Sequence, residues 1–162
     1  MVDLEKAIRS LSKHKVDFVT VGGVAITLHS SAYITSDLNI CYSRSKENIH
    51  RLVSSLAQFQ PWPRGLSREL PFFFDDAALR NGTNFTFDTS IGDIDLLGEV
   101  KGIGDYSEAI GRSVIYEIYD TEVRALDLDG LIIAKTAAGR LKDHLVLPEL
   151  YALREALDPD EE

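Results

Sequence analysis

Two glycines and a pair of oxygen-bearing side chains are the residues of this sequence most suited to chemistry. Gly22 and Gly23 directly follow an apolar run, where a strand turning into a helix would let backbone N–H groups approach an anion. Asp37 and Asn39 alternate with apolar residues further along, so in a strand both point to one face. Mg²⁺ prefers one or two carboxylates together with substrate phosphates. The pattern therefore predicts a phosphate-and-metal site, with ordinary turn chemistry as the alternative.

A second pair of acidic residues lies later in the chain. Asp93 and Asp95 also alternate with apolar residues, so in a strand they share a face with about 7 Å between them. Acidic side chains within an apolar strand are costly to bury without a partner. Two interpretations stay open: a solvent-facing edge of a sheet, or a third carboxylate beside Asp37.

Three basic residues cluster near the C-terminus of a chain that is acidic overall. Lys135 falls on the apolar stripe of an expected helix, and the same stripe reaches Lys142 if that helix continues. A lysine on such a stripe needs an anionic partner or an exit to water, and snorkelling is the commoner explanation. Together with Arg140, however, these side chains would suit a bound polyphosphate.

Helices and strands of the first half would position the glycines and the pair of Asp37 and Asn39. Apolar spacing predicts a helix over residues 3–14, capped by Asp3, and another over 45–58, capped by Ser45. Between them we expect a strand over residues 18–21, a short helix over 24–29 and a second strand from Leu38.

The second half combines an irregular segment with further strands and helices. Residues 60–69, rich in proline, predict no regular element, and the aromatic run 71–74 predicts a buried cover for the core, with base stacking as a weaker alternative. Residues 84–88 and 93–97 predict a β-hairpin, 100–105 a glycine-bearing loop, and 114–119 and 121–126 two more strands. Helices are expected around 106–110, from Leu128 and over 148–157.

These elements predict an α/β fold in the broad, α+β sense: a mixed, mostly antiparallel sheet of about five strands, flanked by helices. At 162 residues the chain is expected to form a single domain, residues 1–162. The C-terminal helices, about 127–157, are expected to pack on it.

Composition narrows the function classes. The formal net charge of −9 disfavours non-specific attraction to nucleic acid or anionic membranes, although it permits a local basic pocket. Cys41 is the single cysteine, so no intramolecular disulfide can form, and its apolar strand predicts a small buried residue rather than a nucleophile. No apolar run approaches membrane-spanning length and no signal-peptide pattern begins the chain. We expect a cytoplasmic protein with no membrane partner.

The stretches VGGVAITLHSSAYITSDLNI, IDLLGE and LDGLIIAKTAAGRLKDH together resemble the nucleotidyltransferase superfamily, in particular the small bacterial minimal and abortive-infection type proteins. The family pattern is a Gly-Gly motif, an Asp-x-Asp on the following strand and a third carboxylate on a later strand. A lysine-bearing helix followed by Arg-x-Lys-Asp completes it. The resemblance extends over nearly the whole chain and implies a nucleotidyltransferase fold.

The resemblance also implies roles for individual residues. Asp37 would be a metal ligand, and Asp95 would be a metal ligand or the group that activates an acceptor hydroxyl. Asp143 would serve either a structural ion pair or catalysis. The implied nucleotide-binding residues are Gly22, Gly23, Thr35, Lys135, Arg140 and Lys142, and the implied ligands of Mg²⁺ (or Mn²⁺) are Asp37, Asn39 and Asp95.

The implied reaction moves a nucleoside monophosphate from a metal-bound NTP to a hydroxyl acceptor and releases pyrophosphate. The acceptor could be RNA, a protein or a small molecule, and the acidic composition disfavours long nucleic acid. Asn39 stands where the family pattern has its second aspartate. It supports the alternative of a catalytically inactive member that binds a nucleotide or a protein partner, in an antitoxin-like or regulatory role. A third alternative is an α+β domain whose glycines and aspartates are only turn residues.

Overall fold

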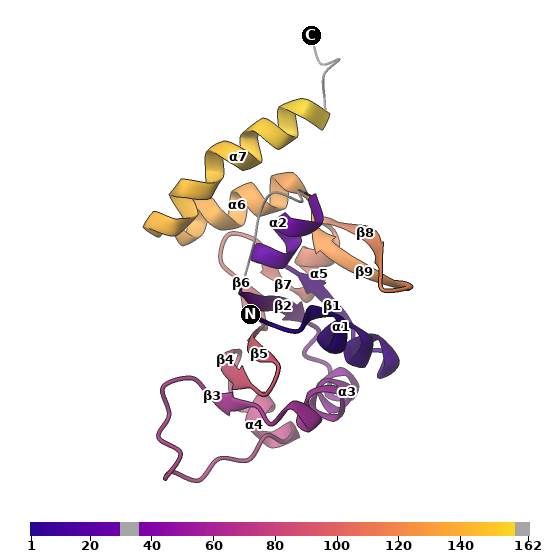
Figure 1. Cartoon of the computed structure of the whole chain (residues 1–162), viewed down its shortest axis with the longest axis vertical. Coiled ribbons are helices and arrows are strands. Elements are labelled where there is room, and N and C mark those ends of the chain that lie inside the picture. The colour runs from indigo at the N-terminus through magenta and orange to yellow at the C-terminus, as the bar shows by residue number, and fades with distance from the viewer. Residues whose placement is uncertain (30–35, 158–162) are drawn as a thin grey trace.

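A mixed sheet forms the centre of the computed structural model, which describes residues 1–29 and 36–157 (Figure 1). Its strands are β1 (Phe18–Thr20), β2 (Asp37–Tyr42), β3 (Trp62–Pro63), β4 (Asn84–Thr89), β5 (Gly92–Leu97), β8 (Ser113–Ile118) and β9 (Thr121–Leu126). Among the described residues they form one seven-stranded sheet in the order β3-β4-β5-β2-β1-β9-β8. The β1–β9 and β2–β5 pairs are parallel and the other neighbours are antiparallel. The α+β class and the mostly antiparallel sheet are thereby confirmed, with more strands than the five or so expected.

The sheet is wider than predicted partly because an edge strand forms where no regular element was expected. β3 pairs with β4 through Trp62↔Asp88 and Pro63↔Phe87. Proline cannot donate a backbone hydrogen bond, so within sheets it is confined mainly to edge strands and bulges, and β3 lies at the edge. The predicted loop at 100–105 is also wrong in part, since β6 (Glu99–Val100) and β7 (Gly104–Asp105) pair there as a separate ribbon.

Helices α1 (Leu4–Lys13) and α3 (Lys46–Leu56) pack against one face of the sheet, and both are confirmed with their caps. The Asp3 carboxylate accepts a hydrogen bond from the N–H of Lys6, and the Ser45 hydroxyl accepts one from the N–H of Asn48. Their apolar stripes meet the inward residues of β2 in one cluster: Ile8, Leu11, Leu38, Ile40, Ile49 and Leu52. This face of β2 is the one that carries no polar site residue.

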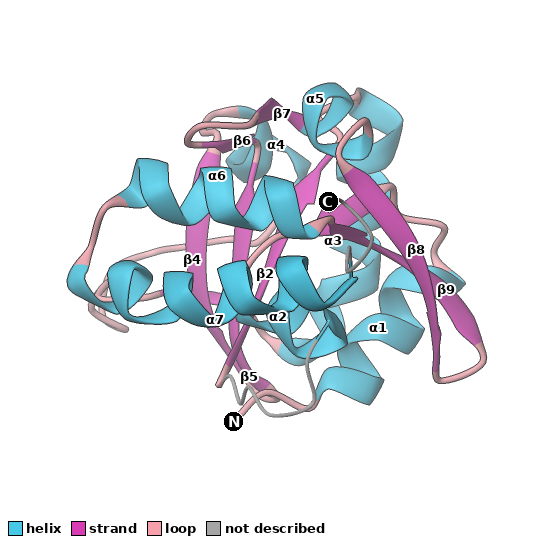
Figure 2. Cartoon of the chain, turned by 90° about the horizontal axis from the view of Figure 1, so that it is seen from above, coloured by secondary structure: helices cyan, strands magenta, loops and turns pink. Residues whose placement is uncertain are grey.

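Helices α6 (Leu128–Ala138) and α7 (Leu141–Leu157) lie side by side across the other face (Figure 2). Gly139 adopts a left-handed conformation with φ of 65° and ends α6, so Lys142 belongs to α7 and not to a continued α6 stripe. The expected start of the last helix near residue 148 is also wrong, because Pro148 lies inside α7. An interior proline removes one backbone hydrogen bond, and Val146 and Leu150 on either side of it are buried in the core.

Shorter helices complete the fold: α2 (Gly23–His29), a 3-10 turn η1 (Ala57–Phe59), α4 (Asp76–Arg80) and α5 (Tyr106–Ile110). The aromatic run is divided, because Phe72 and Phe74 pack against the core whereas Phe73 is exposed. Within the described residues, none of the helices combines the length and the apolar character needed to cross a bilayer.

Candidate functional site

A row of polar residues crosses three neighbouring strands at one level of the sheet and ends at the residue that follows a fourth strand. Asn39 on β2 lies opposite Asp95 on β5, and Asp95 lies opposite Thr86 on β4. The N–H of Arg64, directly after β3, donates to the carbonyl of Thr86 at 2.9 Å. Register partners point to the same face of a sheet. The two central strands therefore bring the Asp37–Asn39 pair and the Asp93–Asp95 pair together, which places Asp95 beside Asp37 as one of the two interpretations of the sequence proposed.

A second row, two residues along, carries three adjacent carboxylates. Asp37 on β2 lies opposite Asp93 on β5, which in turn lies opposite Asp88 on β4. Like charges directly opposite one another destabilise a sheet. A cation between the two rows would relieve this repulsion.

Arg64 supplies that cation. Its Nε donates to Asp88 Oδ1 at 3.3 Å and its Nη2 donates to Asp95 Oδ1 at 3.1 Å, while Asp93 Oδ2 lies 3.6 Å away. Sequence reasoning missed Arg64, because it lies in the segment expected to be irregular. Only the non-local pairing of β3 with β4 brings it to the carboxylates.

Asn39 contacts Asp95 as a hydrogen-bond donor. Its Nδ2 donates to Asp95 Oδ2 at 3.3 Å, and its Oδ1 is buried without a hydrogen-bond partner among the described residues. The amide packs closely on Gly22, where an added Cβ would lie 2.8 Å from Asn39 Cγ. Glycine at position 22 is thus required by the asparagine side chain across the sheet.

The electrostatic environment of Asp95 combines opposing influences. Burial raises its pKa, the Arg64 guanidinium lowers it, and the nearby Asp37 and Asp93 carboxylates raise it again, with a net increase. A carboxylate with a raised pKa accepts a proton more readily than an ordinary aspartate.

The basic cluster is organised around Asp143, whose side chain is fully buried. Lys135 Nζ lies 3.1 Å from Asp143 Oδ1, and Arg140 Nε lies 2.7 Å from Asp143 Oδ2. Burial would raise the pKa of Asp143, but hydrogen bonds from Arg140 and Lys135 lower it to about 2. The structural ion pair, one of two roles implied for Asp143, is therefore formed, and it ties α6 to α7.

These groups meet around one cavity of about 260 Å³ between the sheet and the two C-terminal helices. Its lining contains every predicted site residue that the structure describes, together with Arg64 and Thr86: Gly22, Gly23, Asp37, Asn39, Arg64, Thr86, Asp95, Lys135, Arg140 and Lys142. Thr35 lies outside the described residues. The lining holds four basic and two acidic side chains, in a chain whose net charge is −9.

A second cavity of about 190 Å³ adjoins the first and shares Gly22, Asn39, Lys135 and Arg140 with it. Its other walls are partly apolar: Val21, Leu97, Val100, Ala134 and Ala138, with Asn84, Glu99, Lys101 and Asp143. Together the two cavities reach the size typical of small-molecule sites, roughly 300–1,000 Å³.

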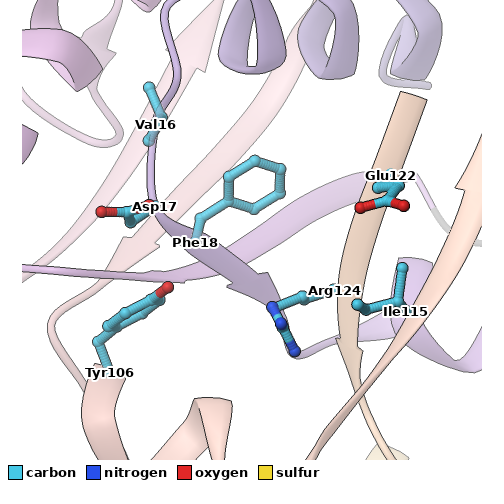
Figure 3. Close-up of a pocket in the computed structure, with 7 residues that line it drawn as sticks. All are labelled: Val16, Asp17, Phe18, Tyr106, Ile115, Glu122 and Arg124. Atoms are coloured by element: carbon cyan, nitrogen blue, oxygen red, sulfur yellow. The ribbon is translucent and has the colours of Figure 1, made fainter.

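A separate pocket of about 170 Å³ lies at the other end of β1, between β1, α5 and the β8–β9 hairpin (Figure 3). It is lined by Val16, Asp17, Phe18, Tyr106, Ile115, Glu122 and Arg124. It contains no predicted site residue and shares no lining residue with the two cavities beside Gly22.

The arrangement of oxygen ligands does not fit a pair of divalent cations. Both oxygens of Asp95 accept hydrogen bonds, from Arg64 and from Asn39. Among residues 1–29 and 36–157, no three His, Cys, Asp or Glu side chains are placed to hold a metal ion together. Two cations on a triphosphate need carboxylate charge, and here Arg64 neutralises much of that charge.

Comparison with solved structures finds proteins of similar fold. No protein-family model matches the sequence, and a search of curated proteins finds no match. The lincosamide antibiotic adenylyltransferase LnuA, solved with lincomycin, is 8% identical with a TM-score of 0.62, covering 94% of this chain and 98% of LnuA. ANT(2″)-Ia, solved with adenylyl-2″-tobramycin, is 14% identical with a TM-score of 0.58, covering 95% and 86% of the two chains.

A third relative is the candidate nucleotidyltransferase TM1012 from Thermotoga maritima. It is 15% identical with a TM-score of 0.58, covering 94% of this chain and 96% of TM1012. At these identities the likeness concerns the fold. The chain thus has a nucleotidyltransferase-like fold, as the sequence resemblance implied.

Proposed function

We propose that this protein binds a nucleoside triphosphate and transfers its nucleoside monophosphate to a hydroxyl acceptor, releasing pyrophosphate. One observation carries the proposal. A single cavity brings together the Gly22–Gly23 backbone, four basic side chains and the buried Asp95 carboxylate. The nucleotidyltransferase-like fold of the chain supports the same function.

The charge of the cavity favours a polyphosphate. Lys135 and Arg140 are held by Asp143, so their positions are set before a ligand arrives and little side-chain freedom is lost on binding. Lys142 and Arg64 add positive charge from α7 and from the segment after β3. An anion carrying several charges is the ligand that this set of side chains would best accommodate.

The transfer step would use the side chains of this cavity. The acceptor oxygen attacks the α-phosphorus, the bond from that phosphorus to the bridging oxygen breaks, and the hydroxyl proton passes to the Asp95 carboxylate. The raised pKa of Asp95 suits a general base. Lys135, Arg140 and Lys142 would stabilise the charge that develops on the departing pyrophosphate. Binding of Mg²⁺ or Mn²⁺ in this cavity is a proposal from the family resemblance. A metal ion could bind Asp95 Oδ1 only after Arg64 releases that oxygen.

A small hydroxyl-bearing molecule is the acceptor that we favour. LnuA is named as an antibiotic adenylyltransferase, and ANT(2″)-Ia was solved with an adenylylated antibiotic. The partly apolar cavity beside the first one offers space for a small molecule. The net charge of −9 opposes long nucleic acid.

A second candidate function is nucleotide binding without transfer, in a regulatory or antitoxin-like role. Asn39 supplies a neutral amide in place of an aspartate, and Arg64 occupies one oxygen of Asp95. Both contacts lower the negative charge available for catalysis. The two candidates share the binding step and differ only in turnover.

Thermal unfolding with each NTP, in Mg²⁺ and in EDTA, tests the binding step. Ligand at 100 times its Kd should stabilise the protein by about 2.7 kcal/mol, a shift on the order of 2–4 °C per kcal/mol. Lys142→Gln should reduce the shift, whereas Lys13→Gln on the exposed side of α1 should not. Absence of a shift with every NTP would contradict both candidate functions.

Pyrophosphate release separates the two candidates. Lincomycin, tobramycin, RNA and a protein mixture can serve as acceptor probes with the NTP that binds. Asp95→Asn should abolish release while keeping the thermal shift, and Asp120→Asn, in the exposed turn between β8 and β9 and outside the cavity lining, is the matched control. Binding without release for every acceptor would favour the second candidate.

A further inference from the structure

Arg64 lies where it can neutralise the carboxylates beside the cavity. Its guanidinium lies between Asp88, Asp93 and Asp95, at 3.1–3.6 Å from their oxygens. In a carboxylate-rich phosphate site a divalent cation normally neutralises the carboxylates so that the anionic substrate is not repelled. In this protein, a side chain of the chain itself already neutralises them.

We propose that Arg64 replaces a divalent cation beside Asp95, so that the cavity binds polyphosphate without a metal ion. The inference rests on the proposed nucleotide-binding function and specifies the form of the ligand, a metal-free polyphosphate. Arg64 acts there as a built-in cation, linked covalently to the site and independent of the metal concentration.

Three features of the structure support the assignment. First, a backbone hydrogen bond places Arg64 beside the carboxylates, because its N–H donates to Thr86 in the same register row as Asp95 and Asn39. Second, Nε and Nη2 make the carboxylate contacts, and Nη1 has no hydrogen-bond partner among the described residues. Third, Arg64 lines the cavity itself. A guanidinium can hold a carboxylate with one edge and present its remaining donors to a phosphate.

The second polar contact of Asp95 agrees with this assignment. Asn39 directs its Nδ2, and not its Oδ1, toward the carboxylate. The amide oxygen of Asn39 lies against the backbone of Gly22, which confines the Asn39 side chain. The two oxygens of Asp95 thus accept from two nitrogen donors, Arg64 Nη2 and Asn39 Nδ2.

Titration calorimetry with inorganic tripolyphosphate tests the proposal, in EDTA and again in Mg²⁺. Wild-type protein should bind tripolyphosphate in EDTA, with a Kd within about threefold of its value in Mg²⁺. Arg64→Gln should weaken binding in EDTA by about tenfold or more, the loss of one charge-assisted contact, and Mg²⁺ should restore part of it because Asp95 becomes available. Arg68→Gln is the matched control, since Arg68 stacks on Trp62 outside the cavity.

The outcomes separate this inference from the proposed function. Binding that requires Mg²⁺, or equal binding by Arg64→Gln and wild type in EDTA, would overturn the inference and leave the polyphosphate site standing. Failure to bind tripolyphosphate in either buffer would overturn the inference and count against the proposed function. Arg64→Lys keeps the positive charge but lacks the forked donors of the guanidinium, so in EDTA it should bind more weakly than wild type and more tightly than Arg64→Gln, which separates the loss of charge from a folding defect in Arg64→Gln.

Discussion

Asn39 and Asp95 lie directly opposite each other on two parallel strands, and the asparagine donates a hydrogen bond of 3.3 Å to the aspartate. The pair occupies the centre of a sheet whose fold is nucleotidyltransferase-like. An aspartate at position 39 would repel Asp95, whereas the asparagine binds to it. The identity of this one residue therefore decides whether the two strands attract or repel at the site.

Replacing Asn39 with aspartate should convert this attraction into repulsion. We expect Asn39→Asp to lower the free energy of unfolding in EDTA by about 1–3 kcal/mol, the range for a lost buried hydrogen bond. Mg²⁺ should recover part of the loss, because two adjacent carboxylates form a better cation site. Thermal unfolding in EDTA and in Mg²⁺ measures both effects. Asn81→Asp, at an exposed position, is the control, and identical behaviour of the two variants would refute the expectation.

Gly22→Ala should disturb the same contact from the other side. A Cβ at position 22 would lie 2.8 Å from Asn39 Cγ, closer than packed carbon atoms approach. We expect a loss of about 1–3 kcal/mol, as for overpacked cores, together with weaker nucleotide binding. Gly111→Ala is the control, because a Cβ there meets its nearest neighbour at 3.5 Å. Urea unfolding compares the two variants, and equal stability would show that Asn39 moves aside without cost.

The ion pairs of Asp143 predict a specific pH dependence of stability. The pKa of Asp143 is lowered from 3.8 to about 2, so the unfolded chain takes up this proton more readily than the folded one. The contribution of Asp143, about 2 kcal/mol, is complete above about pH 5 and is lost as the pH falls through 4 toward 2.

Comparison of wild type with Asp143→Asn isolates this contribution from that of other carboxylates. The difference in the free energy of unfolding should be constant above about pH 5 and should narrow below pH 4. Urea unfolding at several pH values provides the measurement. A difference that stays the same down to pH 2.5 would mean that Asp143 keeps its ordinary pKa.

Cys41 should be unreactive in the folded protein. Its side chain is fully buried, and burial, together with the Asp105 carboxylate, raises the pKa of the thiol to about 12. Only the thiolate is an effective nucleophile, so iodoacetamide should label Cys41 at the rate of unfolding. Mass spectrometry in buffer and in concentrated urea tests this. Rapid labelling in buffer would show that the strand opens locally.

The grouping of the inner side chains could be predicted from the sequence, because it depends on local patterns. Alternation along a strand places Asp37 with Asn39, and Asp93 with Asp95, whatever the rest of the fold. The clustering of Lys135 and Arg140 follows from their short separation in the chain. The parallel pairing of β2 with β5, which joins the Asp37–Asn39 pair to the Asp93–Asp95 pair, was not predicted. Local pattern left a third carboxylate beside Asp37 as one of two interpretations, and the family resemblance implied such a carboxylate on a later strand.

The parts that were missed depend on contacts distant in sequence. Arg64 reaches Asp95 only through the pairing of β3 with β4, and a two-residue strand containing a proline has almost no sequence signal. Lys142 would lie on the stripe of α6 only if that helix continued past Gly139. The left-handed Gly139 ends α6, so Lys142 lies on α7 instead. Glycine is the usual residue at such helix ends, so this signal was present but was outweighed by the apolar stripe.

Because β3 has only two residues, the part of the site that it positions should open more easily than the part on the central strands. Asp37, Asn39 and Asp95 are borne by β2 and β5 in the middle of the sheet, whereas Arg64 follows two paired residues at its rim. Sheet rims fray at a free energy far below that of global unfolding. Fraying of this rim would withdraw the guanidinium and leave the anionic centre in place, and amide exchange at Arg64, compared with Val21, would report it. The positive charge that neutralises the site therefore lies at the least stable edge of the sheet, and the carboxylates that it neutralises lie on the central strands.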